Sequence, residues 1–333
     1  MFDKIGVVIP SVGLVKKCMI NTPPLLGLTS IVLAGTMINA EAITIAHGGP
    51  NAGSVDIDFV DIGNTDVTTG DTANTVNGVN PGVVSYEYSI GTYEVTAAQW
   101  LIVTTADTNV GNAGDWSGLQ PTAGTSWYEA AKFANWLTSG DALLGAYGFS
   151  NSTSFTGVDR AAAIATYGTI YVLPSEDEWY KAAYLKSDGS GYTTYATGNA
   201  TPDGIDDNFD TDYDSVFSEG AEYPDPFEVG DASIENNGTF DMGGNIYEWN
   251  ESAFAGGEPT GSEERVFRGG AWYDESGELQ SSNRSSLTPG NELDDIGFRV
   301  ASVSAAVAAV PEPSSLGLLV IGAMGCVLRR KRG

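Results

Sequence analysis

The sequence has little sulfur and little imidazole. Its two cysteines, Cys18 and Cys326, lie in apolar terminal segments, and its single histidine is His47. The region between the cysteines therefore excludes a disulfide, a thiolate metal site and a cysteine nucleophile. One histidine cannot build a Ser-His-Asp triad or a histidine metal cluster.

Positive charge is also scarce. The formal net charge is −28, and seven of the 15 basic residues lie in the two terminal segments, which leaves eight for everything between. Such an acidic surface repels phosphate backbones, so we expect no nucleic-acid partner. It suits an exterior protein or one that gathers divalent cations, although a plain solvated surface is the simpler interpretation.

The N-terminal segment predicts a signal peptide over residues 1–42. Lys16 and Lys17 supply the positive region, residues 25–38 are apolar, and the sequence Ala-Glu-Ala that ends at Ala42 is typical of a cleavage site. We expect cleavage after Ala42. A retained membrane anchor is the alternative.

The C-terminal segment, residues 311–333, has a definite order of features. The triplet Pro311, Glu312 and Pro313 precedes a 13-residue apolar run and four basic residues. A helix over that run would be about 20 Å long, which is short for a hydrocarbon core of about 30 Å. The order resembles the PEP-CTERM sorting tail, and residues 304–310 form a linker before it.

The resemblance to a sorting tail implies a processing partner, a membrane contact and a cellular localisation. It implies processing by an exosortase-type protease after transient anchoring of the tail in the inner membrane. It further implies the outer surface or extracellular matrix of a Gram-negative bacterium that makes exopolysaccharide. Exopolysaccharide or another surface protein is then an expected partner.

Short periodic segments separated by loops fill the body. Alternating residues predict strands over 56–62 and 83–90, and short strands over 266–268 and 297–300. Long polar and glycine-rich stretches over 64–82 and 189–237 predict loops. Three capping boxes predict helix starts, and the residues concerned are Thr96 with Gln99, Ser126 with Glu129, and Ser175 with Glu178. Gly140 is a candidate C-cap of the second helix.

Six segments in order resemble one family, that of the formylglycine-generating enzyme, also called the sulfatase-modifying factor. They span residues 90–96, 125–137, 173–183, 241–249, 268–272 and 283–299. The resemblance implies one domain over residues 43–303. It also implies an irregular α+β fold related to C-type lectins, with little regular secondary structure.

The resemblance further implies structural calcium. The family pattern places one ion between the carboxylates of Asp241 and Glu248 and the carbonyls of Gly244 and Ile246. Calcium is a hard cation that takes oxygen ligands, so these donors suit it. The alternative is that Asp241 caps its turn and Glu248 pairs with an arginine such as Arg268. A second family site is predicted at Asn208, Phe209, Glu222 and Tyr223.

One departure from the family decides the chemistry. Catalytic members hold copper(I) with two cysteines between the Arg-Gly-Gly and Gly-Phe-Arg motifs, because a soft metal needs thiolates. Here that interval, residues 272–284, has none. Iron-dependent relatives need histidine ligands, which are missing as well. We therefore expect no copper, iron or heme, and neither oxidation reaction.

Three functions stay open after this exclusion. The first is a non-catalytic module that binds a glycan or peptide in the former active-site cleft, lined by Trp272, Tyr273, Asp274, Glu275 and Arg284. In the alternative, Trp272 belongs to the core. The second function is a calcium-assembled structural matrix protein. The third is a divergent enzyme, for example a hydrolase that uses two carboxylates.

Overall fold

Three of the four α-helices in the described part of the chain begin at the predicted capping boxes. The N-caps are Thr96, Ser126 and Ser175, ahead of α1 (Ala97–Ala106), α2 (Trp127–Ser139) and α4 (Glu176–Tyr184). In each box the N-cap hydroxyl accepts a hydrogen bond from the backbone N–H three residues later. The Gln or Glu side chain at that later position accepts one from the backbone N–H of the N-cap residue. α2 ends at Gly140 with a φ of 80°, which confirms the predicted C-cap.

The structure is a computed structural model, and it describes most of the body. The described residues are 31–33, 36–38, 40–63, 68–76, 78–112, 114–151, 154–198, 201–204, 215–218, 225–256 and 259–305, with side chains from residue 41 onward. Most of the predicted signal peptide and the whole sorting tail lie outside these ranges.

Two larger sheets organise the body. The five-stranded sheet is antiparallel and has the order β3 (Ala40–His47), β4 (Gly53–Ile62), β5 (Tyr88–Gly91), β13 (Ala301–Ser304) and β8 (Thr169–Val172). The four-stranded sheet has the order β11 (Ser285–Leu287), β10 (Arg265–Arg268), β9 (Tyr247–Ala253) and β12 (Ile296–Gly297). β12 runs parallel to β9, with Gly297 opposite Glu248.

Smaller elements complete the architecture. They are the hairpins β1 (Ile31–Leu33) with β2 (Thr36–Ile38) and β6 (Tyr147–Asn151) with β7 (Ser154–Val158), the helix α3 (Arg160–Tyr167), and the 3-10 turns η1 (Thr72–Asn74) and η2 (Ser276–Leu279).

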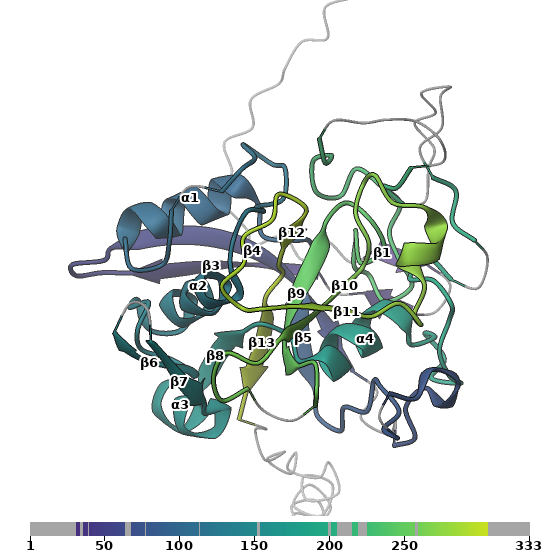
Figure 1. The fold of residues 1–333 in the computed structure, drawn as a ribbon, viewed down its shortest axis with the longest axis horizontal. Coiled ribbons are helices and arrows are strands. Elements are labelled where there is room, and N and C mark those ends of the chain that lie inside the picture. The colour runs from purple at the N-terminus through teal and green to yellow at the C-terminus, as the bar shows by residue number, and fades with distance from the viewer. Residues whose placement is uncertain are drawn as a thin grey trace, which may run out of the picture.

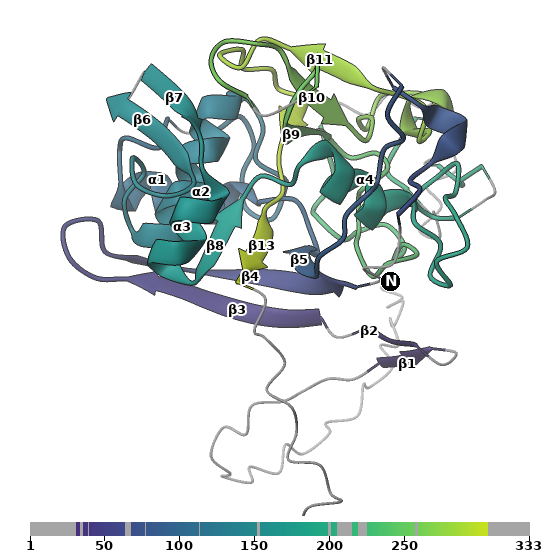
Figure 2. The ribbon, with the colours of Figure 1, turned by 90° about the horizontal axis from the view of Figure 1, so that it is seen from below.

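The helices α1, α2 and α3 lie on one face of the five-stranded sheet, and the four-stranded sheet lies across the body from β3 and β4 (Figures 1 and 2). The β3–β4 hairpin forms an edge of the first sheet. α4 packs beside β9, which links the two halves of the body. The irregular α+β fold class predicted from the sequence is confirmed.

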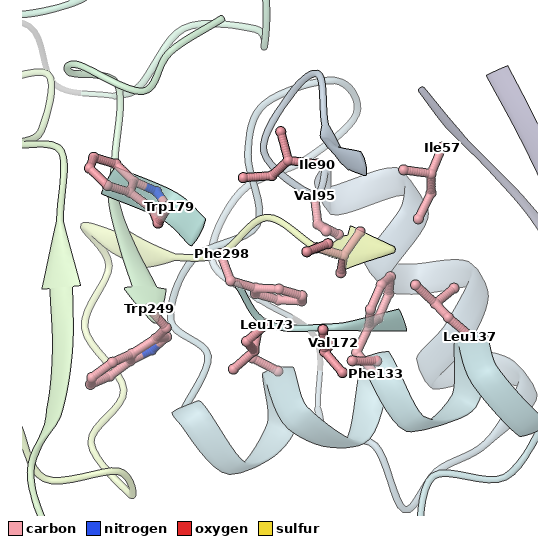
Figure 3. Packing of buried hydrophobic residues seen from close by; sticks show 14 of the residues in the cluster. Ile57, Ile90, Val95, Phe133, Leu137, Val172, Leu173, Trp179, Trp249 and Phe298 are labelled. Carbon is pink, nitrogen blue, oxygen red and sulfur yellow. The ribbon is translucent and has the colours of Figure 1, made fainter. Parts of the chain in front are cut away.

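The core lies between the five-stranded sheet and α2 and extends to the second sheet (Figure 3). Phe133 from α2 meets Phe298 edge to face, with ring centroids 5.3 Å apart. Trp179 and Trp249 continue this core toward the second sheet and are fully buried.

Two predicted strands are wrong in their extent. Of residues 83–90, only 88–90 lie in a strand, as the first part of β5 (Tyr88–Gly91). Side chains of α4 hold the preceding extended segment instead, since Lys181 donates a hydrogen bond to the carbonyl of Val84. The predicted strand over 297–300 is divided between β12 and β13, with residues 298–300 outside both.

The predicted cleavage point lies within β3, whose pairing with β4 runs from Ala40 opposite Val60 to His47 opposite Gly53. A cut after Ala42 would leave the strand beginning at Ile43, and this cleavage point stays a prediction. None of the helices in the described ranges has both the length and the apolar character that crossing a bilayer requires.

Candidate functional site

A tight turn ahead of β9 carries the residues predicted to hold calcium. Asp241 and Asn245 both have a φ of 60°, in the left-handed region. Gly244 has a φ of 101°, and a Cβ there would lie 2.2 Å from the carbonyl oxygen of Val216. Only glycine therefore fits that position without a shift of the backbone.

Asp241 offers an open acceptor. Its side chain is 2% exposed. Its Oδ2 accepts a hydrogen bond of 2.7 Å from the N–H of Gly230, whereas Oδ1 is buried with no hydrogen-bond partner among the described residues. Burial raises the pKa of Asp241 to about 6, against the opposing effect of the Gly230 hydrogen bond.

Glu248 is engaged with an arginine. Its two oxygens accept hydrogen bonds from the guanidinium of Arg299, with a closest contact of 2.6 Å, and both groups are fully buried. Trp179 Nε1 donates to Glu248 Oε2 at 2.8 Å. An arginine partner was one expectation, but it is Arg299 and not Arg268, which binds Glu176 at 2.6 Å.

Two further carboxyl groups lie beside the turn. Glu94 accepts hydrogen bonds from the Asn245 amide at 2.8 Å and from the N–H of Ile246 at 3.2 Å. Glu235 accepts from the N–H groups of Met242 and Gly243. Burial raises the pKa of Glu235 to about 7. Burial, together with the charges of nearby Asp241 and Glu248, raises the pKa of Glu94 well above its ordinary value.

These four residues form the buried acid cluster, which consists of Glu94, Glu235, Asp241 and Glu248. Each is at most 4% exposed. Among the described residues, Arg299 is the one cationic group in direct contact with the cluster. Four carboxyl groups against one guanidinium leave excess negative charge in a dry interior, and bound protons or an added cation relieve it.

The donor set suits calcium in part. Asp241 Oδ1 is an unmatched buried oxygen, and the tight turn supplies carbonyl oxygens, which calcium accepts as ligands. Glu248 can contribute only if an oxygen turns from Arg299 toward the ion. Among the described residues no three His, Cys, Asp or Glu side chains are grouped as metal ligands, so carbonyls would have to complete the shell.

The second predicted calcium site involves four other residues. Asn208, Phe209, Glu222 and Tyr223 all lie outside the described residues. That site stays a prediction.

An aromatic and acidic surface lies beside the same turn. We call it the Trp272 surface, and its members are Trp116, Tyr247, Trp272, Tyr273, Asp274 and Asp295. Trp272 is 5% exposed and meets Trp116 and Tyr273 edge to face, at 5.6 and 5.1 Å. The backbone N–H of Trp272 donates to the carbonyl of Asn245 at 2.9 Å, which connects this surface to the turn.

Trp272 is thus both core and site boundary, while Tyr273 is 49% exposed. The Tyr273 hydroxyl donates to Asp295 Oδ2, and Asp295 Oδ1 has no hydrogen-bond partner among the described residues. The hydroxyl of Tyr247 donates to Asp274, whose Oδ2 also accepts from the N–H of Ala271 at 2.9 Å. Burial raises the pKa of Asp274 above its ordinary value.

The other two predicted ligand residues differ in their placement. Glu275 is exposed directly ahead of η2. Arg284 is held elsewhere, because its guanidinium binds both oxygens of Glu176 at 2.7 and 2.8 Å and lies 4.1 Å over the ring of Phe254. These contacts are with α4 and with the residue directly after β9, and not with the Trp272 surface.

Sequence reasoning missed several members of both groups. Glu94 and Tyr247 lie inside segments that carry the family resemblance, which was the available signal. Trp116 lies in a loop, and Asp295 lies within the last matching segment, directly before its Ile-Gly-Phe-Arg sequence. Nothing local in the sequence joins these two to Trp272, since Trp116 reaches the surface by donating its Nε1–H to the carbonyl of Asp294 at 2.9 Å.

Comparison with known proteins decides the family. Residues 29–303 match the family model of the sulfatase-modifying factor enzyme 1-like domain. The chain belongs to this family. The match covers both the buried acid cluster and the Trp272 surface.

The individual proteins that match share less than a third of their residues with this chain over the matched regions. "Inactive C-alpha-formylglycine-generating enzyme 2" of Mus musculus is 31% identical over 140 residues, which are 39% of this chain and 42% of that protein. The match thus spans less than half of the mouse protein. Two solved structures show the same fold at 23% identity and a TM-score of 0.53. They are Treponema denticola variable protein 1, over 79% of this chain and 98% of that one, and CarF, over 74% and 97%.

The sorting tail is confirmed as well. Residues 309–332 match the PEP-CTERM protein-sorting motif, and they include Pro311, Glu312 and Pro313, which lie outside the described residues. The protein is therefore exported and sorted to the cell surface. The motif implies processing by an exosortase.

Proposed function

We propose that this protein is a non-catalytic ligand-binding module of the cell surface, and that the Trp272 surface binds a glycan. A peptide is the alternative ligand. We further propose that it acts at the outer surface of a Gram-negative cell, in contact with exopolysaccharide.

The proposal rests on one observation: the chain lacks the thiolate and imidazole metal ligands that the catalytic members of the family use. Residues 272–284 contain no cysteine. The one histidine, His47, packs edge to face on Trp136 at 5.0 Å, with its Nε2 3.1 Å from the carbonyl oxygen of Leu137. Carboxylates and hydroxyls do not hold copper(I) comparably to thiolates, so this body supports binding and not oxidation.

The chemistry of the Trp272 surface favours a sugar. Tyr273 presents half of its ring to solvent, and an exposed ring is an amphipathic platform for the apolar face of a sugar. Asp274 and Asp295 flank it with carboxylate oxygens that can accept hydrogen bonds from sugar hydroxyls. Asp295 Oδ1, which lacks a partner among the described residues, would gain one from a bound hydroxyl.

The test is a binding measurement with a matched pair of tyrosine variants. The full-length protein is titrated with oligosaccharides released from exopolysaccharide of the producing cells, and in parallel with a peptide library. Tyr273→Ala should weaken glycan binding about two- to tenfold, as expected for one lost stacking contact. Tyr167→Ala removes a tyrosine of similar exposure, 40%, on α3 and should leave binding unchanged. Equal losses in both variants would reject the Trp272 surface, and peptide binding alone would replace the glycan.

We also propose a structural calcium ion at the turn, with Asp241 as its carboxylate ligand, the carbonyls of Gly244 and Ile246 beside it, and Glu248 shared with Arg299. Support comes from the unpartnered Oδ1 of Asp241 and the excess of buried carboxyl groups. Calcium would raise the melting temperature of the full-length protein over an EDTA sample, and Asp241→Asn should abolish most of that difference. Equal melting temperatures in calcium and in EDTA would reject the proposed calcium ion.

A specific observation favours the second candidate, a calcium-assembled matrix protein. Each basic residue in the described part of the body is at least partly buried, so this surface presents many acids and few accessible cations. Divalent ions could bridge such surfaces between molecules. Light scattering in calcium, magnesium and EDTA decides it: oligomers that form in calcium without any glycan support assembly, and a monomer in all three rejects it.

A further inference from the structure

A pocket opens between the loop that follows β4 and the turn that follows α4. Its volume is about 500 Å³, which lies within the range of roughly 300–1,000 Å³ typical of small-molecule sites. One wall consists of residues 68–72, in the blue loop beside α4 in Figure 1, and the other of residues 185, 186 and 189–192. It shares no lining residue with the buried acid cluster or the Trp272 surface.

The two walls are fixed to each other by hydrogen bonds. The link runs through residues 81 and 82: the N–H of Asp71 donates to the carbonyl of Pro81 at 2.9 Å, and the Tyr192 hydroxyl donates to the carbonyl of Gly82 at 2.8 Å. The N–H of Gly82 also donates to Asp177 of α4 at 2.8 Å. A Cβ on Gly82 would lie 2.5 Å from the Tyr192 hydroxyl. The turn itself is closed by the N–H of Lys186, which donates to the carbonyl of Gly191 at 2.9 Å. The pocket is therefore pre-formed.

The lining suits a hydroxylated ligand. Thr68, Thr69 and Thr72 are exposed on one wall, and each hydroxyl can donate one hydrogen bond and accept two. Opposite them the half-buried ring of Tyr192 provides an apolar wall, backed by the ring of Tyr180 at 5.4 Å. Hydroxyls facing a ring are the pairing that a sugar, polar at its edge and apolar on its face, requires.

Lys186 adds a positive charge to this wall. The body's other lysines are buried, with Lys181 bonded to a carbonyl and Lys132 lying 5.5 Å over the ring of Phe149. Lys186 is only partly buried, and no carboxylate of the described residues lies within salt-bridge distance of its ammonium. Asp188 is close enough to interact with it through space.

We propose that this pocket binds a single acidic sugar, such as a uronic acid, with its carboxylate on Lys186 and its hydroxyls on the threonine wall. A single charge is required because the net charge of −28 repels polyanions. The site is separate from the one in the proposed function and does not depend on it.

The experiment is calorimetric titration of the full-length protein with glucuronate, glucose and acetate. Glucuronate should bind, while glucose and acetate should each bind at least about tenfold more weakly, because each lacks one of the two contacts. Lys186→Met keeps the aliphatic stem and should weaken glucuronate binding about tenfold or more. Lys186→Arg keeps the charge and should retain most of the glucuronate affinity. Tyr167→Ala, which removes an exposed tyrosine of α3 away from both sites, should leave that affinity unchanged.

Each opposite result overturns the proposal. Glucose binding as tight as glucuronate binding would show that Lys186 does not recognise charge. Acetate binding as tight would make the pocket a plain anion site. An unchanged affinity in a folded Lys186→Met protein, verified by its melting curve, or no glucuronate binding at all, would reject the pocket as a sugar-acid site.

Discussion

Replacing Arg299 with methionine should be among the most damaging single changes in this protein. Arg299 is fully buried and binds both oxygens of Glu248. It also donates to the carbonyls of Gly91, Thr92 and Phe240, at 2.8 to 3.2 Å. The change Arg299→Met would leave Glu248 as an unpaired buried charge and three carbonyls without this donor.

The expected cost follows from the burial of the pair. Removing one partner of a buried ion pair typically costs about 3–5 kcal/mol, against a total stability of about 5–15 kcal/mol for a whole domain. For a domain of this size, each kcal/mol shifts the melting temperature by about 2–4 °C. We therefore expect Arg299→Met to melt about 6–20 °C below the unmodified protein.

Two companion variants separate charge from packing. Arg284→Met removes a guanidinium whose partner Glu176 keeps Arg268, so no buried charge is left unpaired and the cost should be smaller than that of Arg299→Met. The double variant Glu248→Gln with Arg299→Met removes both charges and should be more stable than Arg299→Met alone.

The assay is urea unfolding followed by tryptophan fluorescence at pH 5 and pH 7.5. The cost of Arg299→Met should shrink at the lower pH, because burial raises the pKa of Asp241 to about 6 and that of Glu235 to about 7, so both neighbouring acids take up protons there. Equal costs for Arg299→Met and Arg284→Met, or a cost of Arg299→Met that does not change with pH, would refute the reasoning from unpaired buried charge.

Three further predictions concern the turn, its acids and the caps. Gly244→Ala should destabilise by several kcal/mol, because its Cβ meets the carbonyl of Val216, whereas Gly256→Ala, with a similar φ of 90° but nothing within 4 Å, should cost far less in the same unfolding assay. Burial raises the pKa of Glu235 from 4.5 to about 7, so in calcium-free buffer its stabilising contribution is present below pH 4.5 and is lost as the pH rises through 7. Glu235→Gln should remove that slope, and a slope that persists would exclude Glu235 as its source. Ser126→Ala should cost about 1 kcal/mol by loss of the cap of α2, and no measurable loss would contradict the capping box.

Local patterns were enough to place most helices. A capping box depends on residues three apart, so the boxes at Thr96, Ser126 and Ser175 formed as the sequence predicted. The helix α3 was missed although its signals were present. Asp159 caps it and Gly168 follows it, but only Ala163 of its residues is buried, so it has almost no apolar face to reveal it.

Pairings between distant segments were harder to predict. Alternation over residues 83–90 correctly indicates an extended chain, but it does not say whether a strand or a helix side chain is the neighbour. Likewise the sequence offers several arginines for Glu248. The parallel register that sets Gly297 opposite Glu248 brings Arg299, two residues on, to that carboxylate, and spacing along the chain cannot disclose it.

The Trp272 surface illustrates the same limit. The sequence neighbours Trp272, Tyr273 and Asp274 lie together as expected, whereas Arg284, at the end of the same interval, does not join them. The fold turns it instead toward Glu176, which is 108 residues away in the chain. Asp295 reaches Tyr273 from a separate segment, 22 residues on.

The proposed function requires that a family body without thiol ligands binds its ligand and does not oxidise it. Oxygen uptake by the copper(I)-loaded full-length protein, with a cysteine-containing sulfatase peptide as substrate, tests it most directly. The account predicts uptake equal to that of a protein-free blank. Peptide-dependent oxygen consumption that yields an aldehyde on the peptide would contradict it.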